Sequence, residues 1–115
     1  KHKMPDCIFC KIAKKEILAK IVYEGNDILA FDDIEPKAKI HVLIISKKHI
    51  SSVVDLKLED RKMVAEIFLA AQKIAREKRI LKTGFRVLVN YGKDAGQTVN
   101  HLHFHFLGGE KLPFA

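Results

Sequence analysis

The sequence predicts an α+β domain: an antiparallel meander sheet of about five strands, with one long helix and a short N-terminal helix. Two observations support this. Residues 58–79 carry apolar side chains at helical spacing, and five short β-prone runs lie before and after them. No internal repeat, low-complexity stretch or Pro/Gly/Ser-rich linker divides the chain, so residues 1–115 are expected to form a single domain.

The first half of the chain predicts a short helix and three strands. In "CIFCKIAKKEI", residues 7–17, the apolar residues fit a short helix with Lys on its outer side. The runs "KIVYE" (20–24) and "ILAFDD" (28–33) are separated by Gly-Asn-Asp, which predicts a hairpin. The nearly continuous apolar run "IHVLIIS" (40–46) indicates a strand buried on both faces or at a subunit contact.

The second half predicts the long helix and two more strands. Residues 58–79 have acidic side chains early and basic ones late, as helix ends prefer. The apolar positions at helical spacing are Met63, Ile67, Phe68, Ala71, Ile74 and Ala75. The runs "FRVLVNYG" (85–92) and "HLHFHFL" (101–107) are then expected to be strands, separated by a loop at 93–99.

Composition and charge restrict the class of protein. With 48% hydrophobic and 30% charged residues the chain is typical of a globular protein, and no apolar run approaches the roughly 20 residues of a membrane span. The start lacks a secretory signal, Met4 is interpreted as the native start, and a cytoplasmic location is expected. The net charge of +7 comes from scattered Lys, which favours a solvated lysine surface over a nucleic-acid partner.

Three alternating histidines are the most informative feature. On a strand, His101, His103 and His105 share one face, while Leu102, Phe104 and Phe106 take the other and belong to the core. A solvated polar face explains three imidazoles poorly. A metal site made by this strand alone is disfavoured, because parallel side chains do not readily converge on one tetrahedral ion.

Phosphoryl or nucleotidyl transfer is the third interpretation. A neutral imidazole attacks phosphorus while other imidazoles and a glycine-containing loop neutralise charge on the phosphate oxygens. The preceding "DAGQT" suits this role, since Gly96 lets the backbone approach a phosphate and Thr98 offers a hydroxyl. A plain turn is the alternative for this loop.

"HLHFHFL" matches the His-φ-His-φ-His-φ-φ signature, φ being apolar, of the histidine triad (HIT) family. "CIFCKIAKKEI", "ILAFDDIEPKAKIHVLII", "SKKHIS" and "FRVLVNYGKDAGQTV" also resemble its Hint branch in order and spacing. The resemblance implies a HIT-like fold and a hydrolase or transferase acting at the α-phosphorus of purine nucleotides. It implies that His103 forms a covalent nucleotidyl intermediate, that His105 and His41 contact the phosphate, and that His101 fixes the other histidines.

The resemblance also implies a nucleotide site. Asp33, with Asp32 as the alternative, would bind the ribose hydroxyls. Apolar positions around the base would be Phe9, Ile17 and Ile34, for which core packing is the alternative. The phosphate-side loop would supply Asn90, Gly96, Gln97 and Thr98. A homodimer is expected, through the long helices and a strand edge.

Two departures from the Hint pattern leave the substrate open. Thr98 stands where Hint phosphoramidases usually carry Ser, and "GQTV" is closer to the dinucleoside polyphosphate hydrolases. The chain contains no Trp, unlike the tail of animal Hint proteins. An AMP phosphoramidate or adenylate hydrolase is therefore expected first. A dinucleoside polyphosphate hydrolase, or a nucleotide-binding regulatory protein with incidental hydrolysis, is the alternative.

Cys7 and Cys10 form a C-x-x-C pair with zinc-like spacing, although two ligands are half a site and two buried thiols are the alternative. In several bacterial HIT relatives the pair resembles a structural zinc site completed by two histidines, which correspond to His49 and His101. The resemblance thus implies a structural zinc ion and no cofactor for the chemistry.

Overall fold

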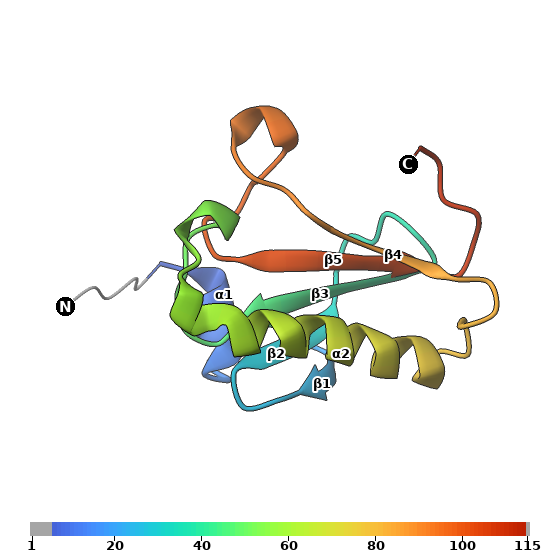
Figure 1. Ribbon diagram of the computed structural model, residues 1–115, viewed down its shortest axis with the longest axis horizontal. Helices are drawn as coiled ribbons and strands as arrows, with labels where there is room; N and C mark the ends of the chain where they lie inside the picture. Colours follow the sequence, from blue (N-terminus) through green and yellow to red (C-terminus); the bar gives the residue numbers. More distant parts are fainter. Residues whose placement is uncertain (1–5, 115) are drawn as a thin grey trace.

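The protein is described by a computed structural model in which residues 6–114 are placed (Figure 1). Met4, the expected start, lies outside them. Five strands are present: β1 (Ile21–Glu24), β2 (Ile28–Asp32), β3 (Ile40–Ser46), β4 (Phe85–Val89) and β5 (His103–Gly108). Two helices accompany them, α1 (Ile8–Ala13) and α2 (Arg61–Glu77), with three single 3-10 turns at Val53–Asp55, Leu58–Asp60 and Lys93–Ala95. The predicted α+β class is confirmed.

The strands form one antiparallel sheet in the order β1-β2-β3-β5-β4. The first three strands form the expected meander. The chain then crosses by way of α2 to the far edge, where β4 lies, and β5 returns between β3 and β4. Strands β3 and β4, which lie on either side of β5, therefore run parallel to each other. Consecutive parallel strands of one sheet need a long crossover connection, which the segment with α2 provides. The histidine-rich strand consequently lies inside the sheet, bonded on both sides.

The sheet has one core on each face. Figure 1 shows α2 lying across one face, and its apolar side chains pack there on alternate residues of the strands, among them Val42, Ile44, Phe104 and Phe106. On the other face the α1 residues Phe9 and Ile12 pack on the intervening residues Leu29, Phe31, Leu43 and Ile45. This alternation confirms that β3 is buried on both faces.

Two helix boundaries and the burial of one side chain differ from the sequence expectation. The long helix begins at Arg61, because residues 58–60 form a 3-10 turn. The short helix ends at Ala13, since Lys15 has a positive φ of 65° that no α-helix accommodates. Phe68, one of the apolar positions at helical spacing, is 48% exposed, although its ring edge still contacts Phe104. None of the helices in residues 6–114 is long and apolar enough to cross a membrane.

Candidate active site and metal cluster

The alternation along β5 divides its side chains as expected. Leu102, Phe104 and Phe106 belong to the core under α2, while His103 and His105 point to the α1 side of the sheet. His101, however, lies in a bend before β5, so the prediction that it belongs to the strand is wrong. This bend turns its ring away from the other two, toward the cysteine pair.

In its neutral form, the His103 ring is held in one tautomer by the backbone. Its Nδ1 lies 2.7 Å from the carbonyl oxygen of His101. Because a carbonyl only accepts, Nδ1 carries the hydrogen and Nε2 keeps its lone pair. The edge of the Phe9 ring packs against this imidazole, with the ring centres 5.1 Å apart. The neutral His103 ring thus directs an oriented Nε2 lone pair away from its own backbone, as a nucleophile requires.

His41 and His105 form a second hydrogen-bonded unit. The backbone N–H of Lys37 donates to His41 Nδ1 at 2.9 Å, so in the neutral ring the hydrogen is on Nε2. That Nε2 lies 2.9 Å from His105 Nδ1 and 3.4 Å from Asp33 Oδ2. His105 Nδ1 therefore accepts, and its Nε2 carries a hydrogen that can be donated to a phosphate oxygen.

Burial keeps these two rings neutral. Desolvation is the main cause that lowers the pKa of His41. Desolvation, reinforced by His103 and His41, lowers the pKa of His105 to about 4. Near pH 7 both rings therefore act as neutral hydrogen-bond partners.

A cavity of about 640 Å³ opens beside these histidines. Its walls include most residues of the predicted nucleotide site: Phe9, Ile17, Asp33, Ile34, His41, Asn90, Gly96, Thr98, His103 and His105. Asp32, the alternative ribose ligand, lines it as well. Its walls are apolar at the α1 end and carry carboxylates, histidines and the loop after β4 elsewhere, which suits a ligand with an apolar ring and an anionic group.

Gln97 does not line this cavity. Its side-chain oxygen accepts the N–H of Gly92 at 3.1 Å, and its side-chain nitrogen donates to the carbonyls of Ser51 at 2.9 Å and Val99 at 3.1 Å. Gln97 thus fixes the loop that carries Gly96 and Thr98. Gly96 adopts a left-handed conformation with φ 86°, which favours glycine.

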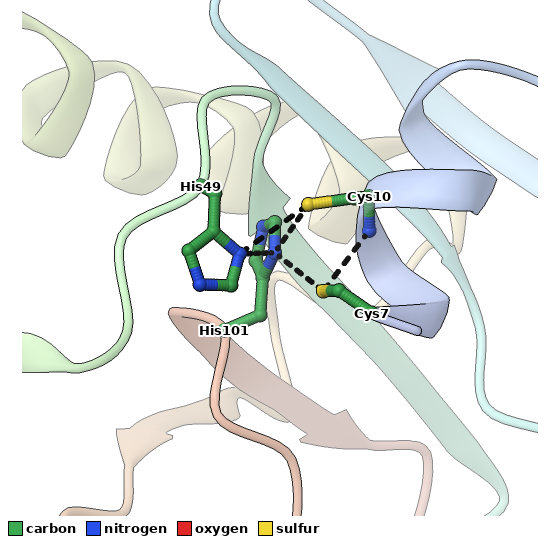
Figure 2. Close-up of side chains that lie close together, drawn as sticks. All are labelled: Cys7, Cys10, His49 and His101. Carbon is green, nitrogen blue, oxygen red and sulfur yellow. Dashed lines mark hydrogen bonds between the residues drawn. The ribbon is translucent and has the colours of Figure 1, made fainter. Parts of the chain in front are cut away.

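The cysteine pair and two histidines converge at the N-terminal end of α1 (Figure 2). His101 Nε2 donates to the Ser46 carbonyl at 2.7 Å, so its Nδ1 has a free lone pair. This Nδ1 lies 3.2 Å from Cys7 Sγ, 3.6 Å from Cys10 Sγ and 3.2 Å from His49 Nδ1. Cys10 Sγ lies 3.3 Å from His49 Nδ1.

These spacings suit a tetrahedral ion. Zinc bonds of about 2.3 Å to sulfur and about 2.0 Å to nitrogen place neighbouring ligand atoms about 3.3 to 3.8 Å apart. The observed separations of 3.2 to 3.6 Å agree. Burial, with the adjacent Cys7 thiol, raises the pKa of Cys10 to about 11, so a bound cation would be needed to hold the Cys10 sulfur as a thiolate near pH 7.

Asp33, His41 and His105 also bring ligand-type atoms within 4.8 Å of one another. They suit a metal less well. His41 already uses Nδ1 to accept the Lys37 N–H, so its Nε2 carries a hydrogen and has no lone pair to give. We therefore describe this group as a hydrogen-bond chain.

Two contributors were not found from the sequence. Lys37 and Ser46 set the protonation of His41 and His101 through their backbone N–H and carbonyl groups. Backbone groups are common to all residues, so no residue-type signal marks such roles. Only the position of each residue beside a histidine in the fold reveals them.

Comparison with known proteins identifies the family. A family model described as "Scavenger mRNA decapping enzyme C-term binding" matches residues 6–112. Protein HitA of Neisseria gonorrhoeae is 43% identical over 105 residues, covering 91% of this chain and 97% of HitA. The chain belongs to the histidine triad (HIT) family.

Solved HIT structures share the whole fold. A histidine triad protein from Clostridium difficile is 47% identical with a TM-score of 0.93, covering 100% of this HIT protein and 99% of that chain. A HIT family hydrolase from Legionella pneumophila Philadelphia 1 is 42% identical with a TM-score of 0.91, covering 95% and 97%. The predicted family and the HIT fold are thus confirmed.

Proposed function

We propose that this HIT protein is a nucleotide-binding hydrolase that acts at the α-phosphorus of purine nucleotides and releases a nucleoside monophosphate. The Legionella relative is described as a hydrolase, and a 31% identical structure from Candida albicans as a histidine triad nucleotide-binding protein. The observation that carries the proposal is the His103 ring. Its Nδ1–H is bonded to the His101 carbonyl, which leaves Nε2 as a free nucleophile at the cavity wall.

In the proposed first step, His103 Nε2 forms a bond to phosphorus while the bond from phosphorus to the leaving group breaks. The leaving atom takes up a proton from solvent, which we assign to transfer through the Thr98 hydroxyl. His105 donates its Nε2–H to a phosphate oxygen. A water molecule then attacks phosphorus, releases His103 and returns a proton to solvent, so the net reaction consumes one water.

The rest of the cavity would hold the nucleotide. We place the base against the apolar residues Phe9, Ile17 and Ile34, and the ribose hydroxyls at Asp33. Asn90, Gly96 and Thr98 would surround the phosphate. Gln97 would support binding indirectly, because its side chain holds the loop in place.

The test is hydrolysis of a lysyl AMP phosphoramidate, followed by release of AMP. His103→Ala should reduce turnover by at least a hundred-fold, roughly the effect of removing a nucleophile or its stabilising donor. Quenching of a single turnover with alkaline denaturant, in which a histidine–phosphorus bond survives, should leave label from a phosphorus-labelled substrate on the wild-type protein and none on His103→Ala. A His103→Ala variant as fast as wild type would rule out the mechanism.

Two alternatives make different predictions in the same assay. A dinucleoside polyphosphate hydrolase would show a higher kcat/KM for diadenosine polyphosphates than for the phosphoramidate. A regulatory nucleotide-binding protein would bind AMP tightly and hydrolyse neither substrate faster than the uncatalysed rate. The cavity and His103 favour an enzyme, and Thr98 leaves the leaving group to be measured.

We also infer that Cys7, Cys10, His49 and His101 hold a structural zinc ion that the chemistry does not require. The converging donor atoms support this. The ion would fix His101, whose carbonyl orients His103. Metal analysis should find about one zinc per chain, and Cys10→Ser should lower that content severalfold. Zinc-free wild type with unchanged thermal stability would contradict the inference.

A homodimer is the oligomeric state that we propose. One edge of the sheet, β4, is unpaired within residues 6–114, and Phe68 and Leu69 of α2 are exposed. An apolar helix surface and a free strand edge are features that a second copy can cover. Sedimentation should give twice the chain mass, and Leu69→Glu should shift the measured mass toward that of the monomer.

The cytoplasmic location and the lack of a nucleic-acid partner remain predictions.

A further inference from the structure

One hydrogen atom in the active site faces two acceptors. His41 is 5% exposed, and its Nδ1 is occupied by the Lys37 N–H, so the neutral ring has a single hydrogen, on Nε2. His105 Nδ1 lies 2.9 Å from that nitrogen and Asp33 Oδ2 lies 3.4 Å from it. The nearer acceptor is neutral, and the farther one is a carboxylate, which accepts more strongly. The two acceptors therefore compete for one N–H.

The carboxylate of Asp33 is oriented for this competition. Its Oδ1 accepts the backbone N–H of Glu35 at 2.8 Å, which fixes the side chain and leaves Oδ2 beside His41. Asp33 also lines the cavity. A hydroxyl donor on a bound ligand can thus reach a carboxylate that already contacts His41.

We propose that ribose binding at Asp33 is coupled to the chemical step through His41 and His105, and that the enzyme therefore favours ribonucleotides in kcat as well as in KM. The proposal rests on the proposed function. When ribose hydroxyls donate to Asp33, the carboxylate no longer draws the His41 hydrogen. His41 Nε2 then donates that hydrogen to His105 Nδ1 alone, which obliges His105 to carry its own hydrogen on Nε2, toward the phosphate. Asp33 is a positioning residue in this step.

Few charged groups act on the hydrogen-bond chain formed by Asp33, His41 and His105. The charges that act on the pKa of His41 are those of Asp33 and Lys37. The pKa of His105 is affected by the same two residues and also by His41 and His103. Asp33 and Lys37 come from the segment between β2 and β3, and His103 from β5. Both His41 and His105 are neutral near pH 7 because burial disfavours their charged forms. The coupling consequently depends on where one hydrogen is directed and needs no net proton transfer.

The experiment compares single-turnover rates for AMP, 2′-deoxy-AMP and 2′,3′-dideoxy-AMP phosphoramidates. We expect wild type to react about three- to ten-fold more slowly at saturation with the dideoxy substrate than with the ribonucleotide. The reason is that a smaller fraction of molecules has the His105 hydrogen on Nε2, where it can be donated to the phosphate. In Asp33→Asn the side-chain nitrogen can face His41, so the competing acceptor is lost. This variant should show a raised KM for the ribonucleotide but equal saturating rates for all three substrates.

Glu35→Gln is the matched control. Glu35 is on the same segment and lines the same cavity, and its carboxylate makes no hydrogen bond within residues 6–114. This variant should keep the wild-type ratio of saturating rates. Equal saturating rates in wild type, with differences only in KM, would overturn the proposal, as would an Asp33→Asn variant that keeps the wild-type ratio.

A measurement without turnover separates this inference from the proposed function. Nitrogen-15 NMR of the imidazoles should show His105 Nδ1 as a stronger hydrogen-bond acceptor with bound AMP than with bound 2′,3′-dideoxy-AMP. If no phosphoramidate is hydrolysed, the proposed function fails, and the NMR comparison still decides the coupling. Identical imidazole signals in the two complexes would overturn the coupling even in an active enzyme.

Discussion

Mild acid should destabilise this protein through its buried imidazoles. The pKa of His105 is about 4 in the folded chain, against an ordinary value of 6.5. Above pH 6.5 the ring is neutral in both states and no penalty arises. As the pH falls from 6.5 toward 4, the unfolded chain binds a proton that the folded chain refuses, so the free energy of unfolding decreases.

The size of the effect follows from this pKa difference. At pH 5 the linkage relation gives about 2 kcal/mol for His105, which we reduce to about 1 kcal/mol because the ring is partly exposed and screened by solvent. His101 is fully buried, and its pKa is also lowered to about 4 by desolvation, so it adds about 2 kcal/mol. A total near 3 kcal/mol is a large part of a typical stability of about 5 to 15 kcal/mol.

Urea unfolding of the metal-free protein at pH 7.5, 6 and 5 would measure this loss. Circular dichroism at 222 nm is the suitable probe, because the chain contains no Trp. Glu24 does not interfere with this measurement. Its hydrogen bond with Lys47 lowers its pKa from an ordinary value of 4.5, so the stability that Glu24 contributes is lost only below that pH. His105→Asn should reduce the difference between pH 7.5 and pH 5 by about 1 kcal/mol. Equal wild-type stability at these two pH values, or an unchanged difference in the variant, would refute the reasoning.

Three further predictions concern the core, the loop and the metal cluster. Ile67→Ala, at a fully buried position of α2, should lower the free energy of unfolding by about 3 kcal/mol, whereas Leu81→Ala, at a 52% exposed position after α2, should change it by less than about 1 kcal/mol in urea titrations. Gln97→Ala removes three hydrogen bonds, so limited proteolysis should cut within residues 92–99 faster than in wild type. A strong chelator should lower the melting temperature of wild type and leave that of Cys10→Ser unchanged.

The sequence predicted the elements and the face of β5 that His103 and His105 occupy, because strand alternation and helical spacing are local properties. It did not predict that β5 lies between β3 and β4, since strand order depends on how α2 crosses the sheet. The bend at His101 was also missed, because a strand pattern gives no sign of where pairing begins. Gln97 was expected to contact the ligand, yet its amide bonds to Ser51, 46 residues away, and no local pattern reveals such a contact.

The inner position of β5 also bears on how the site forms. Without β5, the described strands would leave β3 with an open edge and β4 with no partner at all. The strand that carries His103 thus joins two otherwise separate parts of the sheet. The other residues of the site surround His103 only after β5 has paired with both β3 and β4. Backbone amides of β5 should therefore exchange with solvent only through global unfolding, and partially folded chains should have no activity.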